Sequence, residues 1–551
     1  MAGAGSETWH LSSDAMLIVL LPLAMLAAKS PLQRSIEFAL NNPFKGVYQL
    51  NAFDVALLIP YFTILVILSL YGLHRYMLVY TYFKYRKNAT GEPVKRFEEL
   101  PTVTIQLPLY NERYVVEQLL ESVCHIEYPR EKLEIQVLDD STDETAAIAE
   151  AAAHRWSALG HPVTYIHRSD REGFKAGALQ NGMRRSSGEL IAIFDADFVP
   201  PPDFLLRTVH YFTDPRVGMV QTRWTYHNRN QSFLTQVEAI LLDGHFVLEH
   251  GARARSHRFF NFNGTAGVLR RAAIEDAGGW EHDTLTEDSD LSYRAQLKGW
   301  KFLYVPQVEC PSELPVEMVA FQVQQARWAK GLIQTGKKIL PRLLRAPVPL
   351  RIKTEGWFHL TCNISYPLML VLSVLLLPAM IVRFYQGWFQ MLYIDLPLFI
   401  ASFCSISSFY LVSQKELYPD RWKRTFLLIP FLMGTGIGLT LTNTQAVLEA
   451  LLGIQSPFQR TAKYGCAKSS KYRRRSHWLP WVDLILGSYF LLTVFYAISA
   501  ENYFTVPFLL LFVIGYYYAA ILMLVQDNRE ALARWGQVLL PWRLAYRQAS
   551  R

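Results

Sequence analysis

Long apolar stretches lie near both ends of the chain and enclose a region with a different pattern. Residues 51–73 are apolar over a length that can cross a bilayer, and a shorter run at residues 15–28 is of marginal length. We interpret the shorter run as a span, with an interfacial helix as the alternative. Further spans are predicted at residues 357–382, 388–412, 478–499 and 503–525. The pattern therefore predicts a soluble region held between membrane helices.

Between residues 100 and 340, short runs of strand-forming residues alternate with helical patterns. Strands are predicted at residues 103–107, 133–138, 163–167 and 190–194, and helices at residues 117–124, 145–159 and 176–186. This βαβ rhythm predicts a mostly parallel sheet with helices on both faces. Ligands of such sheets bind beyond the carboxyl ends of the strands, so polar residues at those ends are the first candidates for chemistry.

One apolar stretch, residues 425–453, does not read as a simple span. Glycine, threonine, asparagine and glutamine interrupt it, and both of its flanks are basic. If both flanks are cytosolic, the stretch cannot cross once, so we predict a re-entrant or interfacial helix. The predicted order is an N-terminal membrane region of about two spans (1–88), a cytosolic domain (100–340), spans (341–412), the interfacial helix (425–453), a cytosolic loop (454–477), spans (478–526) and a basic cytosolic tail (527–551).

Composition supports this reading and excludes other classes of protein. Hydrophobic residues make up 51% of the 551 residues, and the formal net charge is +8. We attribute the charge to the excess of Lys and Arg on the cytosolic side of membrane proteins. No nucleic-acid reader motif is present. The five cysteines form no CxxC pair, so neither zinc nor a disulfide framework is indicated. No Lys or Arg precedes Lys29, so the basic region of a signal peptide is absent.

Two aspartates, Asp195 and Asp197, follow the predicted strand at 190–194. Residues two apart on an extended chain point to the same side. Two carboxylates on one side can hold Mg²⁺ or Mn²⁺ against a diphosphate, because hard cations take oxygen ligands and bridge phosphate oxygens. The pair therefore predicts a divalent-metal site for a nucleotide sugar.

The neighbouring strand ends supply candidates for nucleotide binding. One of Asp139 and Asp140 can contact the base or ribose, although either can also cap the next helix. Tyr110 can stack on a base and Glu112 can accept hydroxyl hydrogen bonds. Lys175 opens a helix beside glycines, where it can pair with a diphosphate; a solvated surface lysine is the alternative.

Two later islands carry candidates for the transfer itself. Asp288, in Thr286-Glu287-Asp288, is our candidate for the general base that deprotonates an acceptor hydroxyl, with Glu287 as a positioning neighbour. Gln324, Arg327 and Trp328 share one helix face. Arg327 can neutralise a leaving diphosphate, and Trp328 offers a flat face for a sugar ring. Acceptor-lining residues are predicted in a Gly-rich stretch at Phe262, Asn263 and Gly264.

Taken in order, these islands resemble the D, DxD, TED and QxxRW set of family 2 glycosyltransferases of the cellulose synthase superfamily. The stretches at 135–143, 193–198 and 262–267 most resemble the cellulose synthase-like glucan and mannan synthases of types A and C. The resemblance implies a type A glycosyltransferase fold, an α/β domain inserted between transmembrane helices. It also implies a gating loop of pattern FxVTxK, matched by Phe458, Thr461 and Lys463, with Arg460 in place of the family's valine.

The resemblance implies an inverting, processive β-glycan synthase that extrudes its polymer across the membrane. UDP-glucose is the favoured donor and GDP-mannose the other candidate, with membrane lipids, a growing polysaccharide and an export subunit as expected partners. No nucleic acid is expected. The resemblance predicts a bacterial inner or plasma membrane location, or the Golgi for a plant protein. Single transfer to a lipid is the alternative enzyme, and a transporter or scaffold without catalysis the alternative class. No cyclic-di-GMP domain is expected behind the loop.

Overall fold

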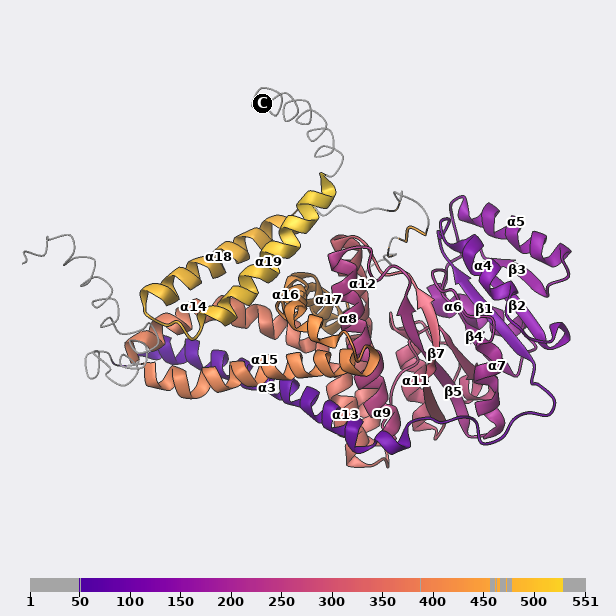
Figure 1. The fold of residues 1–551 in the computed structure, drawn as a ribbon, viewed down its shortest axis with the longest axis horizontal. Coiled ribbons are helices and arrows are strands. Elements are labelled where there is room, and N and C mark those ends of the chain that lie inside the picture. Colours follow the sequence, from indigo (N-terminus) through magenta and orange to yellow (C-terminus); the bar gives the residue numbers. More distant parts are fainter. Residues whose placement is uncertain are drawn as a thin grey trace, which may run out of the picture.

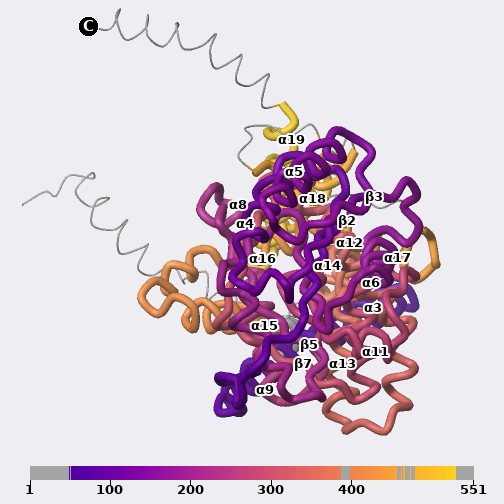
Figure 2. The backbone as a smooth tube through the Cα atoms, turned by 90° about the vertical axis from the view of Figure 1, so that its right-hand side faces the viewer, coloured from indigo at the N-terminus to yellow at the C-terminus, as the bar shows by residue number. Residues whose placement is uncertain are grey.

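The computed structural model describes residues 49, 51–386, 388–455, 461, 463–465, 472 and 478–528. The predicted span at 15–28, the gating-loop residue Phe458 and all but the first two residues of the basic tail lie outside these residues. Figure 1 shows the described chain as an α/β domain on one side and a group of long helices on the other. Figure 2, turned by 90°, places the α/β domain in front of those helices.

The domain is built on one seven-stranded sheet of order β3-β2-β1-β4-β6-β5-β7. Its strands are β1 (Val103–Leu109), β2 (Leu133–Asp139), β3 (Val163–His167), β4 (Leu190–Ile193), β5 (Val217–Tyr226), β6 (Gly267–Arg270) and β7 (Lys301–Ser312). All neighbouring pairs are parallel except those of β6, which runs antiparallel to both β4 and β5. The mostly parallel sheet is therefore as predicted. The sequence pattern predicts no strand after residue 194, so β5, β6 and β7 are additional to the prediction.

Helices cover both faces of the sheet, as the βαβ rhythm predicts. The helices of the domain are α4 (Val116–Cys124), α5 (Thr145–Ala158), α6 (Phe174–Arg185), α7 (Phe204–Thr208), α8 (Phe233–Gly244), α9 (Gly251–Arg255), α10 (Arg271–Asp276) and α11 (Glu287–Leu297), with short turns η1 (Arg86–Asn88), η2 (Arg130–Lys132) and η3 (Val209–Thr213) and a π-helix η4 (His245–His250). Side chains alternate between two cores. Ile105 and Leu107 of β1 pack with α4, α5 and α7, whereas Ile191 and Ile193 of β4 pack with α6, α10 and α11.

Five helices of the described chain are long and apolar enough to cross a membrane, or six if one bent pair counts as a span. One is the continuous run Leu350–Tyr385, built from α13 (Leu350–Thr361), η5 (Cys362–Ile364) and most of α14 (Ser365–Gln386). The other four are α3 (Ala52–Lys84), the part of α15 (Trp388–Leu417) from Pro397 onward, α18 (Leu479–Ser499) and α19 (Val506–Asp527). Helix α3 continues to Lys84, eleven residues past the predicted end of its apolar run at residue 73.

The ambiguous stretch at 425–453 forms the bent pair. Turn η6 (Trp422–Leu428) and α16 (Ile429–Gly438) are followed by α17 (Thr440–Leu452), and the two parts meet at 42°. Helix α12 (Met318–Arg345) stands between the sheet domain and the long helices in Figure 1. It packs against both α13 and α17, so it connects the α/β domain to the apolar helices.

Candidate active site

A cavity of about 600 Å³ opens at one edge of the sheet. The carboxyl ends of β1, β4, β5 and β7 meet at this edge, and the loop that leads into β6 lies there too. Helix α12 and residues after α17 complete the wall. Of the residues predicted for the site, the cavity is lined by Tyr110, Glu112, Asp140, Lys175, Asp195, Asp197, Asn263, Gly264, Glu287, Asp288, Gln324, Arg327, Trp328, Thr461 and Lys463.

The structure separates the two aspartates at the end of β2. Asp140 lines the cavity, and Arg168 holds it through two bonds, Nε to Oδ1 at 2.8 Å and Nη2 to Oδ2 at 2.5 Å. Asp139 is fully buried and lies outside the cavity lining. Its Oδ2 accepts a hydrogen bond from the Tyr165 hydroxyl at 2.8 Å and lies 3.2 Å from His167 Nδ1. Asp140 is therefore the one placed to meet a ligand, and Asp139 fixes β2 to β3.

An arginine that the sequence reading missed covers the predicted base-stacking residue. The guanidinium of Arg171 lies 3.3 Å from the centre of the Tyr110 ring, and both side chains line the cavity. Arg171 is in the loop before α6, far from Tyr110 along the chain, so no local pattern marks it. A cation stacked on an aromatic ring gives this end of the cavity a flat, positively charged wall.

Two lysines face the two aspartates after β4. Lys175 Nζ lies 2.5 Å from Asp195 Oδ1 and also donates to the Gly264 carbonyl at 2.9 Å. Lys463 Nζ lies 2.6 Å from Asp197 Oδ2. Burial lowers the pKa of each lysine, but the facing carboxylates outweigh it and raise the pKa above its ordinary value. Both lysines therefore stay charged.

The donor set of Asp195 and Asp197 fits a divalent cation. Both carboxylates reach the cavity, with side chains 35% and 13% exposed. The two aspartates would hold Mg²⁺ or Mn²⁺ together with phosphate oxygens, because these ions usually bind nucleotides through one or two carboxylates and the phosphates. Lys175 and Lys463 are then the groups beside such an ion that can face phosphate oxygens.

Asp288 lies in the first turn of α11 and lines the cavity close to Gly264 and Lys175. Its Oδ1 accepts a hydrogen bond from the Ser289 backbone N–H at 2.7 Å, and it forms no ion pair with the residues that the structure describes. Burial raises its pKa to about 7, and the negative charge of Glu287 adds to the effect. Burial also raises the pKa of Glu287. A carboxyl that titrates near neutrality is suited to accept a proton from a hydroxyl.

The Gly-rich stretch approaches this acid closely. A Cβ on Gly264 would lie 3.0 Å from Asp288 Oδ2, and the φ angle of Gly264 is +78°. Both the short contact and the backbone conformation therefore require glycine. Asn263 also lines the cavity. Phe262 does not line it: its side chain is fully buried in the core between β4, β6 and α6. The structure therefore places two of the three predicted acceptor residues at the cavity and one behind it.

Helix α12 presents Gln324, Arg327 and Trp328 to the cavity from one face, as their spacing predicts. An ion pair connects α12 to α17. Lys330 Nζ contacts Glu449 of α17 at 2.7 Å. The face of α12 that lines the cavity is thus held at a fixed place relative to the long helices.

The loop after α17 closes one side of the cavity through a residue that the sequence reading missed. Glu313, directly after β7, accepts hydrogen bonds from the backbone N–H groups of Tyr464 at 2.8 Å and Gly465 at 2.9 Å. Its carbonyl accepts from Lys463 Nζ at 2.5 Å. The partners are about 150 residues apart, so only the fold reveals the contact. Lys463 and Thr461 reach the cavity as a consequence.

The chain is similar in sequence to known proteins. A family model described as "Glycosyltransferase like family 2" matches residues 101–331. The similar curated proteins include glucomannan 4-beta-mannosyltransferase 2 of Arabidopsis thaliana, which is 42% identical over 46% of this chain and 49% of that protein. Probable glucomannan 4-beta-mannosyltransferase 7 of Oryza sativa subsp. japonica is 44% identical over 48% of this chain and 46% of that protein. The chain thus spans about half the length of the curated relatives it matches.

Among solved structures, a mannosyltransferase from Pyrobaculum calidifontis in complex with GDP-Man and Mn2+ is similar at a TM-score of 0.46 and 23% identity, over 65% of this chain and 99% of that one. The expected α/β domain, with its mostly parallel sheet between apolar helices, is confirmed, and the glycosyltransferase family 2 model matches this domain. The leaning toward UDP-glucose finds no support, because these relatives are named for mannosyl transfer.

Proposed function

We propose a donor, an acceptor and a mechanism for this chain, whose residues 101–331 are a glycosyltransferase domain of family 2 and which is homologous to the glucomannan 4-beta-mannosyltransferases. The chain transfers mannosyl residues from GDP-mannose to the end of a growing β-mannan-type polysaccharide. The names of the relatives support mannose as the sugar. The main support for this reaction is that one cavity is lined both by Asp195 and Asp197, a pair suited to a divalent cation, and by Asp288, whose pKa is raised to about 7.

The donor is bound by the strand-end wall. Asp140 and the stacked pair of Tyr110 and Arg171 hold the nucleoside, and Asp195 with Asp197 hold Mg²⁺ or Mn²⁺. The ion, when bound, neutralises the diphosphate and makes it a better leaving group.

Transfer inverts the anomeric carbon in this scheme. Asp288 takes the proton of the acceptor hydroxyl, whose oxygen then forms a bond to the anomeric carbon. The bond from that carbon to the phosphate oxygen breaks at the same time, and the nucleoside diphosphate leaves. Arg327 faces the negative charge that develops on the leaving group, where a fixed cation stabilises it. Trp328 stacks on the terminal acceptor sugar, and the polymer leaves between the long helices.

The protein is placed in a membrane with the catalytic domain on the cytosolic side, where nucleotide sugars are available. The five apolar helices support the first part of this proposal. A Golgi membrane fits the plant origin of the relatives named above.

A donor assay tests the proposal. The full chain, purified in detergent, is incubated with GDP-mannose or UDP-glucose, Mn²⁺ or Mg²⁺ and a manno-oligosaccharide, and nucleotide release and product mass are measured. We expect a ladder of mannosylated products from GDP-mannose only, absent in Asp288→Asn. Product from UDP-glucose alone would overturn the mannan assignment in favour of a glucan synthase. A lipid carrying one sugar as sole product would favour the single-transfer alternative.

A further inference from the structure

The cavity-lining face of α12 continues along the helix to Lys338, and Gln334 on it also lines the cavity. Gln324, Arg327 and Trp328 line the site, and Gly331, Gln334, Thr335 and Lys338 follow them along the same face at spacings of three and four residues. This second half of the face contacts residues 281–290, the segment that carries Glu287 and Asp288.

Three contacts in the middle of the face are close. The backbone N–H of Leu285 donates to Gln334 Oε1 at 2.9 Å, and the hydroxyls of Thr286 and Thr335 are 3.1 Å apart. A Cβ on Gly331 would lie 2.5 Å from Thr286 Cγ2, so the helix backbone touches the segment directly. The acid-bearing segment therefore rests on α12 without a gap.

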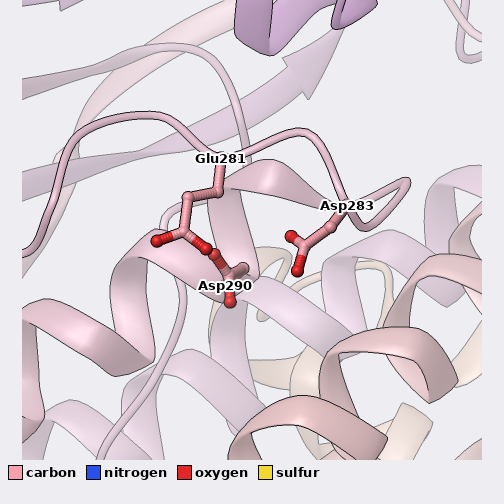
Figure 3. Close-up of side chains that lie close together, drawn as sticks. All are labelled: Glu281, Asp283 and Asp290. Carbon is pink, nitrogen blue, oxygen red and sulfur yellow. The ribbon is translucent and has the colours of Figure 1, made fainter.

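Lys338 closes this contact with charge. Its Nζ lies 2.7 Å from Asp283 Oδ1 and 3.1 Å from Asp290 Oδ1, and it also contacts the carboxylate of Glu281. Carboxylate oxygens of the three residues lie within 4.8 Å of one another, and Figure 3 shows the three side chains close together. Three such groups repel unless a cation lies among them. Lys338, with a side chain 15% exposed, pairs with all three, and Arg294 pairs with Glu281 at 3.6 Å and with Asp290 at 2.8 Å. Because the carboxylates already have these cations, we treat the cluster as an ion-pair clamp.

The clamp also reaches into α11. Asp290 is fully buried, lies two residues after Asp288, and is held on its other side by Arg294 at 2.8 Å. Arg294 donates in turn to the Gly279 carbonyl at 3.0 Å, which fixes the loop ahead of the acids. Moving Lys338 would therefore change the place of Asp288 relative to the cavity-lining half of α12.

We propose that Lys338 is a positioning residue for glycosyl transfer. By binding Glu281, Asp283 and Asp290 together, it fixes the distance between the base on α11 and the acceptor-binding face of α12. The inference rests on the proposed function, because it assigns Asp288 and Trp328 to the two reacting partners. It predicts that loss of the clamp misplaces the acceptor hydroxyl while nucleoside binding at Tyr110, Arg171 and Asp140 is unchanged.

The test compares Lys338→Met with Lys338→Arg in the full chain. For Lys338→Met we expect kcat for transfer to fall about tenfold or more, the KM for GDP-mannose to stay within about twofold, and nucleotide release per sugar incorporated to rise as water replaces the acceptor. Lys338→Arg keeps the charge and restores most of the coupling. The matched control is Lys337→Met, the adjacent residue, which instead donates to the α17 carbonyls of Ala450 and Leu451.

Hydrogen exchange gives a readout that needs no turnover. In Lys338→Met the Leu285 amide should exchange at least about tenfold faster than in the unaltered chain, with the amides of β1 and β4 unchanged. Unchanged exchange at Leu285, or wild-type kcat and coupling, would overturn the inference. A uniform rise in exchange across the sheet would also overturn it, because Lys338 would then only stabilise the fold. Absence of turnover with any donor in the unaltered chain would count against the proposed function, and the exchange measurement would still decide on the clamp.

Discussion

Replacing Asp288 by Asn should abolish transfer and yet stabilise the protein at pH 8. Burial raises the pKa of this carboxyl from its ordinary 3.8 to about 7. At about 1.4 kcal/mol for each pH unit, the charged form is disfavoured in the folded state by at most about 4 kcal/mol. Asp288 borders the cavity, and water there screens its charge, so we expect a stabilisation of about 2 kcal/mol in Asp288→Asn.

The pH dependence has a definite sign. Between pH 4 and 7 the folded state binds the Asp288 proton more tightly than the unfolded state, so the stability of the unaltered protein falls as the pH rises through this window. The advantage of Asp288→Asn should therefore be full above pH 7 and shrink toward pH 4. For a domain of this size, about 2 kcal/mol corresponds to a melting temperature roughly 4–8 °C higher.

Thermal unfolding followed by tryptophan fluorescence in detergent, at pH 8 and pH 5, measures the difference. Asp290→Asn is the matched control, two residues along the same helix. Asp290 is paired with Arg294 and Lys338, so its neutralisation should lower the melting temperature at pH 8. A lower melting temperature for Asp288→Asn at pH 8, or the same gain at both pH values, would refute the reasoning about its uncompensated charge.

Catalysis supplies the second half of this prediction. Removing a general base costs about 10²- to 10⁴-fold in rate. In the unaltered enzyme, kcat/KM should fall as the pH drops below about 7, because Asp288 becomes protonated in the free enzyme. A flat profile between pH 6 and 8 would remove Asp288 from the role of base.

Three further substitutions test the rest of the cavity. Gly264→Ala places a methyl group 3.0 Å from Asp288 Oδ2 at a φ of +78°, and should lower kcat/KM at least about tenfold and also lower the melting temperature, because alanine is strained at this φ. Glu313→Gln weakens the two hydrogen bonds from the loop after α17 and should raise the KM for the donor about tenfold, with faster amide exchange in residues 464 and 465; an unchanged KM would show that this loop does not cover the donor. Asp195→Asn should weaken Mn²⁺ binding at least about tenfold by electron paramagnetic resonance in the presence of GDP, and equal binding would move the metal site elsewhere.

Local pattern was enough to predict the strand-end acids. Parallel strands bring their carboxyl ends to one edge, so Asp140, Asp195 and Asp197 reach one cavity. Pattern could not choose between Asp139 and Asp140, because neighbouring residues at a strand end point to opposite sides and either side can hold a ligand. The choice is made by Tyr165 on β3, which takes the Asp139 carboxylate.

Contacts between distant segments were beyond the sequence. No local pattern distinguishes Glu313, and the strand before it was not predicted. Its role becomes visible only in the fold, where residues 464–465 donate hydrogen bonds to it. Phe262 lies beside two cavity residues, but its large apolar side chain turns into the core, where burial stabilises it most. Proximity in sequence to a Gly-rich turn therefore predicted the backbone of the site and not each side chain.

The acids of the cavity differ in whether a cation is paired with them, and this difference matches the roles proposed for them. Arg168 compensates Asp140, Lys175 compensates Asp195, and Lys463 compensates Asp197. These three are the carboxylates assigned to a ribose hydroxyl or a metal ion. Asp288 forms no ion pair within the described chain, and the nearby charge of Glu287 adds to its burial. Lys175 offsets only part of this effect, so the acid binds a proton near neutral pH, which suits a general base and not a metal ligand. The same reasoning explains why Lys338 pairs with Asp290 and not with Asp288. A cation paired with Asp288 would fix its position but would also lower its pKa, and the carboxylate would then be a weaker base.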